Sequence, residues 1–134
     1  SQFIDINEIN ADGNTALLLA MKANNYKLVK NIIDRFGDKI DINHQNSDKE
    51  SAMLYAVMSE PRYIHILYNK MNNIEFSLQN KDGNTALMLF IITCDYSMTS
   101  TISKSIHGYP ITMSFFITEL LKKKQFTSHE KKFV

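Results

Sequence analysis

Hydrophobic residues in this chain form short dense runs, and polar turn-forming stretches separate them. Three runs cover residues 16–21, 52–58 and 86–92, and almost every side chain in them is apolar. A helix on the surface of a globular protein keeps one polar face, so these runs predict short helices that are covered on more than one side. An amphipathic pattern follows the first run, with apolar residues between Leu28 and Ile33 opposite charged ones, and predicts a second helix.

A string of six residues, Asp-Gly-Asn-Thr-Ala-Leu, opens the first and third runs, at residues 12–17 and 82–87. A degraded copy, Asn46-Ser-Asp-Lys-Glu-Ser-Ala52, opens the second run. Aligned at the Thr or Ser that precedes each run, the copies lie 36 and 34 residues apart. A unit that recurs about every 33 residues is typical of a protein built from stacked repeats.

Each unit should contain a turn, a buried helix, an amphipathic helix and a connecting loop. Gly13 suits a turn position with positive φ, and the Thr15 hydroxyl can cap the buried helix by accepting from a backbone N–H. Gly37 marks the end of the amphipathic helix. Lys49 replaces the turn glycine in the second copy, at about 1 kcal/mol if φ stays positive there.

These patterns give specific expectations for the helices and the core. We expect no extended sheet. The expected helices cover residues 16–23, 26–35, 52–58, 62–71, 86–94 and 112–123, and the expected buried residues include Leu17, Leu19, Ala20, Met53, Ala56, Leu87 and Leu89.

The units resemble the ankyrin repeat. Roughly residues 3–121 carry the resemblance, which implies an all-α repeat fold (a solenoid), an ankyrin-like stack of helix-turn-helix units joined by hairpin-like loops. The family's Pro and His positions hold other residues here, which makes the chain a divergent member. The first unit matches the family pattern at Asn10, Gly13, Thr15, Leu17, Ala20, Leu28, Val29, Ile32, Ile33 and Asp41-Ile42-Asn43, and the departures are Ala16, Ala52 and Ala86 for Pro and Leu18, Leu54 and Met88 for His.

We expect one ankyrin-repeat domain over residues 1–134. The buried helix of the first repeat has no polar outer face, as a terminal repeat would need. Its N-terminal flank should therefore be covered, either within a longer array or by another molecule, self-association included. The expected divisions are residues 1–7 as the tail of a preceding repeat, repeats at 8–43, 44–77 and 78–121, an insertion at 95–112 between the helices of the third repeat, and a C-terminal tail at 122–134.

The insertion is rich in serine and threonine, a composition typical of a loop. Pro110 suits the first turn of the helix that would follow it. Phe90 stands where the earlier repeats have Ala20 and Ala56, and its ring would overpack a regular fourth repeat by about 1–3 kcal/mol. We therefore expect the insertion to cap the stack, although a binding loop and a tolerated surface loop are alternatives. The expected partners of Phe90 are Ile102, Ile106, Tyr109 and Ile111.

Composition and charge indicate no nucleic-acid-binding, membrane-spanning, metal or catalytic site. A net charge of +1 gives no electrostatic footprint for nucleic acid, and no apolar run reaches the length of a membrane span. The four histidines lack metal-ligand spacing with one another or with the single cysteine, Cys94. We expect no catalytic, cofactor or metal site. A lone cysteine fits a reducing compartment, so we expect an intracellular, cytoplasmic protein, in the host cytoplasm if it is a secreted effector.

The resemblance implies a non-catalytic protein–protein interaction module, an adaptor or inhibitor, that binds a protein partner through its turn tips and concave helix face. The alternative is a substrate- or host-target-recognition segment of a larger effector or enzyme whose catalytic part lies outside this chain. The expected protein-binding residues are Asp12, Asn14, Lys22, Ser47, Asp48, Glu50, Met58, Ser59, Lys81, Asp82, Asn84 and Ile92.

Overall fold

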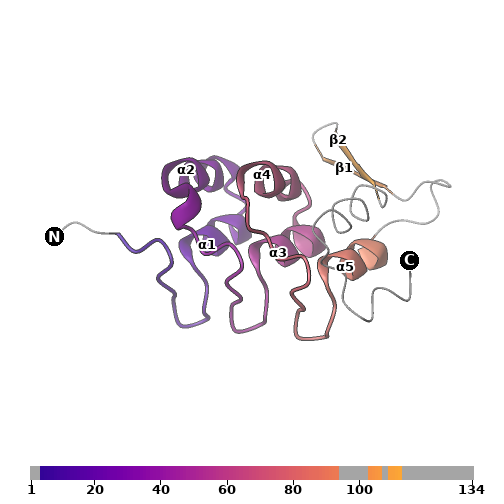
Figure 1. Ribbon diagram of the computed structural model, residues 1–134, viewed down its shortest axis with the longest axis horizontal. Helices are drawn as coiled ribbons and strands as arrows, with labels where there is room; N and C mark the ends of the chain where they lie inside the picture. The colour runs from indigo at the N-terminus through magenta and orange to yellow at the C-terminus, as the bar shows by residue number, and fades with distance from the viewer. Residues whose placement is uncertain (1–3, 94–102, 107–108, 113–134) are drawn as a thin grey trace.

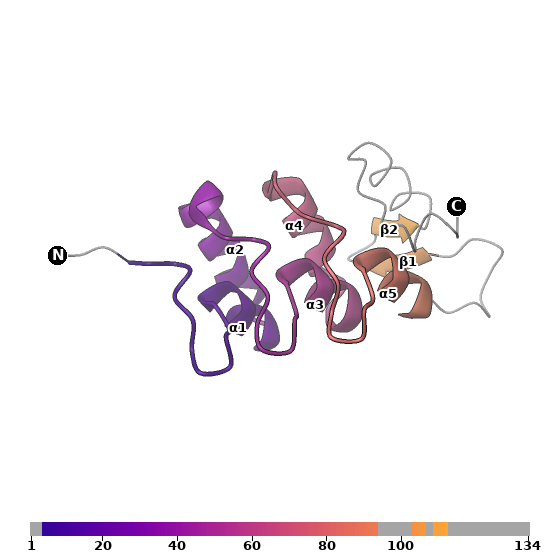
Figure 2. The same ribbon diagram turned by 60° about the horizontal axis from the view of Figure 1, so that its bottom comes forward.

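The computed structural model describes residues 4–93, 103–106 and 109–112. Its helices stack side by side in sequence order, and hairpin-like loops project from one edge of the stack (Figure 1). The first helix of each unit lies in one row and the second helices lie in a row beside it, as the rotated view also shows (Figure 2). The first row holds α1 (Ala16–Lys22), α3 (Ala52–Ser59) and α5 (Ala86–Thr93), and the second holds α2 (Tyr26–Phe36), which continues into the 3-10 helix η1 (Gly37–Lys39), and α4 (Tyr63–Lys70).

An asparagine side chain holds the turn that opens each unit. The Oδ1 atoms of Asn10, Asn46 and Asn80 each accept the backbone N–H groups two and four residues later, at 2.9–3.0 Å. A short polar side chain that bonds the backbone just ahead of it favours a turn over a helix. The three turns are therefore copies of one another in chemistry as well as in sequence.

The third residue after each asparagine has a left-handed backbone. Its φ is 77° at Gly13, 59° at Lys49 and 81° at Gly83. Lys49 thus adopts the conformation that glycine adopts at little cost, so the positive φ on which the predicted strain depends is present.

Hydroxyl groups begin the first helices. The side-chain oxygens of Thr15, Ser51 and Thr85 each accept from the backbone N–H three residues later, at 3.2–3.4 Å, and all three residues are buried. These bonds satisfy N–H groups that have no partner within the helix. The expected capping role of Thr15 is confirmed, and the other two units share it.

The first helices are buried by their neighbours. Helix α3 packs against α1 on one side, α5 on the other and α4 behind it. Each apolar side chain that is fully buried contributes about 1.5–3 kcal/mol, so packing between neighbouring first helices stabilises the stack. Five of the eight residues of α3 are buried, namely Ala52, Met53, Leu54, Ala56 and Val57.

An arginine joins the first two units at the turns between first and second helices. The guanidinium carbon of Arg62 lies 5.2 Å from the ring centroids of both Tyr26 and Tyr63, and the two rings stack at 5.7 Å. Nη2 of Arg62 also donates to the carbonyl of Asn24 at 3.0 Å. Asn24 has a φ of 54°, so it takes the turn conformation that asparagine tolerates better than most residues.

The predicted helices of the described region agree with the structure to within about one residue at each end. Of the residues expected to be buried, only Leu19 is exposed, with 44% of its surface accessible, and that expectation was wrong. The equivalent residues of α3 and α5 are covered by a preceding unit, whereas the described residues place no helix pair before α1.

The insertion differs from its prediction. It contains two antiparallel strands, β1 (Ser103–Ile106) and β2 (Tyr109–Thr112), which lie at the α5 end of the stack (Figures 1 and 2). Pro110 lies within β2, so its placement in the first turn of a helix was wrong. A two-stranded sheet has two edges, where a proline need not break the hydrogen-bond ladder.

Phe90 is fully buried, as expected of a ring that needs a cover. Ile102 and residues 113–123 of the predicted last helix lie outside the described residues. The role of the insertion as the cover of Phe90 therefore stays a prediction, as do the repeat divisions.

Replacing Lys49 with glycine should stabilise the protein. The substitution removes the left-handed strain, partly offset by the greater freedom of glycine in the unfolded chain, so we expect a gain of about 0.5–1 kcal/mol. Urea denaturation measures the free energy of unfolding.

The matched controls for this experiment are Gly83→Ala and Gly13→Ala. Both should destabilise, and Gly13→Ala should cost more, because a Cβ there would lie 3.1 Å from the backbone N of Ser47, whereas the space around Gly83 is open. A Lys49→Gly variant that is less stable than the original chain would contradict the claim that the backbone at Lys49 is strained.

Candidate protein-binding face

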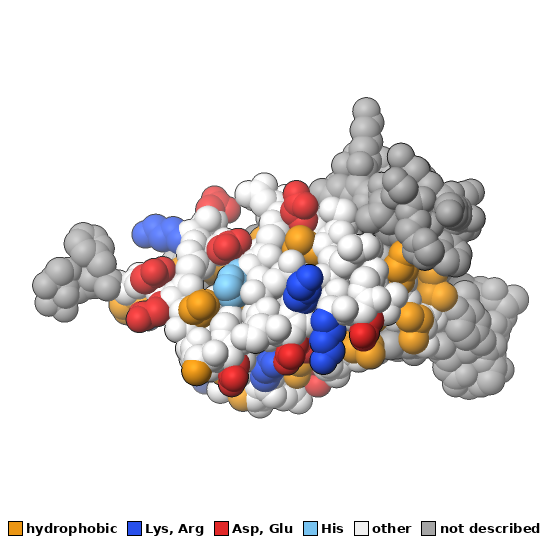
Figure 3. Space-filling view, turned by 90° about the horizontal axis from the view of Figure 1, so that it is seen from below, with side chains coloured by type: hydrophobic (Ala, Val, Ile, Leu, Met, Phe, Trp, Pro, Cys, Tyr) orange, Lys and Arg blue, Asp and Glu red, His pale blue; other side chains and the backbone are white. Residues whose placement is uncertain are grey.

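The turn tips form the first part of the predicted binding face. Asp12, Asp48 and Asp82 occupy the same tip position in the three units, and all three are exposed. Seen from below, this side of the molecule carries acidic and basic side chains close together, with apolar ones between them and toward the α5 end (Figure 3). Ser47 and Lys81 are exposed beside the aspartates. The tips therefore offer a polar surface of mixed charge.

The last turns of the first helices form the second part. Lys22, Met58 and Ile92 each lie seven residues after the capping hydroxyl, so they occupy equivalent positions in α1, α3 and α5. All three are exposed, with 53% of Met58 and 60% of Ile92 accessible. Because α3 packs between α1 and α5, the three side chains form a row across the stack, which we call the helix row. This row is cationic at its first position and apolar at the other two.

Asn14 belongs to the stack. It is buried, and its Oδ1 accepts from Nδ2 of Asn46 at 2.8 Å, which joins the first unit to the second. Asn84 is half-buried, with its backbone N–H bonded to Asn80. Of the predicted tip residues, Asn14 is therefore the least accessible to a partner.

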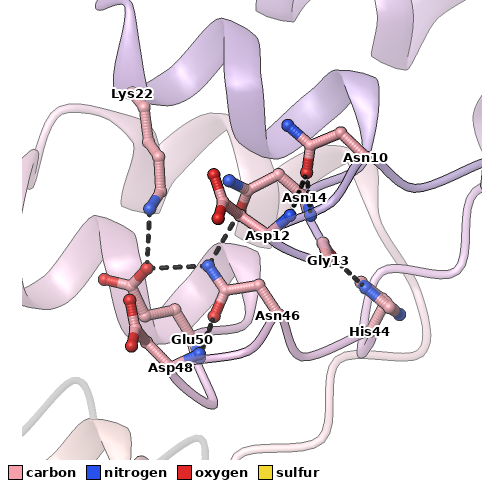
Figure 4. Close-up of polar contacts among 9 residues, drawn as sticks. All are labelled: Asn10, Asp12, Gly13, Asn14, Lys22, His44, Asn46, Asp48 and Glu50. Atoms are coloured by element: carbon pink, nitrogen blue, oxygen red, sulfur yellow. Dashed lines mark hydrogen bonds and ion pairs between the residues drawn. The ribbon is translucent and has the colours of Figure 1, made fainter.

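An ion pair joins the tips to the helix row. Nζ of Lys22 lies 2.9 Å from Oε1 of Glu50, and the same oxygen accepts from Nδ2 of Asn46 at 2.8 Å (Figure 4). The ammonium of Lys22 also lies 5.7 Å from the ring centroid of Tyr55, within the range of a cation–π contact. The turn of the second unit thereby fixes a side chain of the first.

The sequence analysis missed three members of this network. Asn46 was recognised only as a turn residue, and Tyr55 only as part of an apolar run. His44 was dismissed as a metal ligand, yet its Nε2 lies 2.7 Å from the carbonyl of Gly13 in the preceding unit (Figure 4). No pattern within one unit marks these roles, because all three residues contact the preceding unit.

The network shifts the pKa values of its members. The hydrogen bond to Glu50 raises the pKa of Lys22 and outweighs the opposing effect of burial. Burial alone would raise the pKa of Glu50, but hydrogen bonds from Asn46 and Lys22, with the nearby positive charges, lower it overall. Burial is the largest cause of the raised pKa of Tyr55. Glu50 and Lys22 are therefore held as a charged pair at neutral pH.

Replacing Glu50 with glutamine should remove a pH-dependent part of the stability. At neutral pH the cost should be up to about 1 kcal/mol, because the pair is partly exposed. The folded pKa of Glu50 lies below its unfolded value near 4.5, so its contribution is complete above that value and is lost as the pH falls through the folded pKa. Urea denaturation of both proteins across this pH range measures the difference.

Glu8→Gln is the matched control, because it removes an exposed carboxylate outside the network and should change stability little. If Glu50→Gln lowered the free energy of unfolding as much in acid solution, below the folded pKa, as at neutral pH, the loss would not come from the charge of Glu50.

The described residues offer little for other kinds of site. Among them, no group of three or more His, Cys, Asp or Glu side chains is placed to hold a metal ion. Within the same part of the chain, every helix is too short or too polar to span a lipid bilayer.

Comparison with known proteins supports a repeat family. Residues 12–47 match the family model of the ankyrin repeat, a span that runs from the tip of the first unit to the tip of the second. No match is found among curated proteins. In the structure, the turn, cap and first helix of the matched unit occur in three stacked copies. Ankyrin repeats are in general protein–protein interaction modules. The matched unit is therefore an ankyrin repeat, and the whole stack is consistent with a divergent ankyrin-repeat protein.

Proposed function

We propose that this chain is a non-catalytic adaptor or inhibitor that binds a protein partner across its turn tips and helix row. The observation that supports this most directly is the pair Met58 and Ile92, two large apolar side chains that are more than half exposed at equivalent positions of neighbouring units. An exposed apolar patch with a polar rim is a common mark of an interaction site. The fold alone would carry no such conclusion.

The surroundings of this pair suit an interface. Ser59 is exposed beside Met58, and Asp48 and Asp82 are exposed at the tips of the same units. Stable interfaces combine an apolar centre with a polar rim that satisfies hydrogen bonds. Methionine adapts its shape to a partner, because its side chain is unbranched and polarisable.

The spacing of the row favours an extended partner segment. Packed helices lie about 8–10 Å apart. An extended segment in the polyproline II conformation advances about 3.1 Å per residue with three residues per turn, so every third side chain points the same way. Ile92 and Met58 would therefore contact apolar side chains about three residues apart in the partner. A further step of about three residues reaches Lys22, where an acidic side chain could compete with Glu50 for the ammonium.

The second candidate is a recognition segment of a larger effector or enzyme whose catalytic part lies elsewhere. The open apolar flank of α1, where Leu19 is exposed, favours this reading, because such a face suits a longer array. In either case the proposed binding face is the same. The single cysteine favours a reducing compartment, so we propose that the protein acts in the cytoplasm.

The double variant Met58→Asp/Ile92→Asp tests the proposed face. Affinity capture with the immobilised chain, followed by quantitative mass spectrometry, should identify partners whose recovery falls about tenfold or more in the variant, a loss of about 1.4 kcal/mol. Both side chains are exposed in the free protein, so circular dichroism and thermal unfolding should change little.

The matched control is Asn31→Asp/Asn69→Asp, which adds the same charge to exposed positions in the row of second helices and should keep the partners. Equal recovery by the two double variants would exclude the helix row as the binding face.

A further inference from the structure

The side of α1 that faces away from α3 is hollow. An apolar groove of about 540 Å³ lies there, and Ile4, Leu19 and Leu28 are exposed along it. A second hollow of about 330 Å³ shares Ile4 and Leu19 and adds the polar residues Asp5 and Asn10. Together these residues form what we call the N-terminal flank. Neither hollow involves the helix row.

The same positions are covered in the later units. Ile4 is 73% exposed, whereas its equivalents Ile40 and Ile74 are 8% and 3% exposed. Leu19 is exposed at a position where Leu89 of α5 is buried. In the second and third units, a preceding helix pair provides the cover. The surface equivalent to the N-terminal flank is therefore covered by a neighbouring unit in the second and third units and exposed in the first.

Polar groups follow the same pattern. Between the first two units, the backbone N–H of Asp41 donates to Oδ1 of Asn7 at 2.8 Å, and that of Ser47 donates to the carbonyl of Asp12 at 3.0 Å. Between the next two units, Glu75 donates to Asn43 at 2.8 Å in the same way. In the first unit, the donors equivalent to Asp41 and Ser47 are the N–H groups of Asp5 and Ala11, at the N-terminal flank.

We propose that the N-terminal flank is the seat of a further helix pair of the same repeat kind, joined to the chain ahead of Ile4. The pair would fill the apolar groove, and the loop and turn that precede it would supply acceptors to the N–H groups of Asp5 and Ala11, as Asn7 and Asp12 do for Asp41 and Ser47. The alternative occupant is a second copy of the chain. A dimer formed through two N-terminal flanks would place one hollow opposite another, so both surfaces would pack poorly. It would also bring donors to face donors.

The geometry of the existing joints supports this occupant. In the joint between the first two units, α1 packs against α3. Ala16 and Ala20 of α1 line the open groove, and their equivalents in α3 are Ala52 and Ala56. Small side chains let helices approach closely, so a copy of the first unit would meet a surface with the same small residues. Leu19 takes the place of the larger Tyr55 and leaves slightly more room.

A duplication in register tests the proposal. Residues 7–39 are copied and joined directly to Ile4, which reproduces the link to Ile40 and includes the Asn7 acceptor. Thermal unfolding of the extended and original chains is then compared. The extended chain should melt several degrees higher. Leu19→Lys should shift the midpoint of the original chain by less than about 2 °C and lower that of the extended chain by about 5 °C or more, because only there is the position buried.

Asn69→Lys is the matched control, because this exposed residue of α4 should tolerate lysine equally in both proteins. An unchanged midpoint on extension, with Leu19→Lys tolerated in both proteins, would overturn the proposal. Sedimentation velocity of the original chain gives a second test. A dimer that Leu19→Lys dissociates would show that a second copy occupies the flank, and would overturn it as well. Neither result bears on Met58 and Ile92.

Discussion

A helix that is apolar on every side cannot be buried by a single partner helix, and this constraint organises the molecule. Helix α3 satisfies it through α1, α4 and α5, so its stability belongs to three units at once. In such an array each unit depends on its nearest neighbours, and no unit is stable alone. The open side of α1 follows from the same constraint, because a first helix with one neighbour fewer must expose apolar surface such as Leu19.

Hydrogen bonds between neighbouring units fix how one unit is positioned on the next, which hydrophobic burial alone does not define. Asn7 and Asn43 each bridge to the next unit through both ends of the amide, donating to the carbonyls of Lys39 and Asn73 at 2.9 and 2.7 Å. In the third unit Ser77 stands in their place, and its hydroxyl lies 3.5 Å from Glu75 within its own unit. A serine side chain is too short to make the same bridge. The regular joint therefore changes at the unit that also carries Phe90 in place of alanine.

Local chemistry made much of this fold predictable from the sequence. The turn asparagines, the positive φ of Lys49 and the capping hydroxyls act within five residues, so a repeated string reveals them. The exposure of Leu19 was mispredicted because burial depends on the neighbouring units, which a pattern within one unit does not count. Pro110 was misplaced because proline suits both a helix start and an edge strand.

The candidate face was less predictable than the fold. The sequence placed Met58 and Ile92 on the surface correctly, because equivalent positions in a repeat share their exposure. It also included Asn14, whose contact with Asn46 spans two units and leaves no mark in the local pattern. The pairing of Lys22 with Glu50 was missed for the same reason, since the two residues lie 28 positions apart in the sequence.

Native-state hydrogen exchange tests most directly the claim that neighbours on both sides hold the first helices. The hydrogen-bonded amides of α3 should exchange only through global unfolding, whereas those of α1, with one side open, should exchange through a smaller opening. The account predicts a lower opening free energy for Ala20 and Met21 than for Ala56 and Val57. Equal protection of the two helices, or stronger protection of α1, would contradict it.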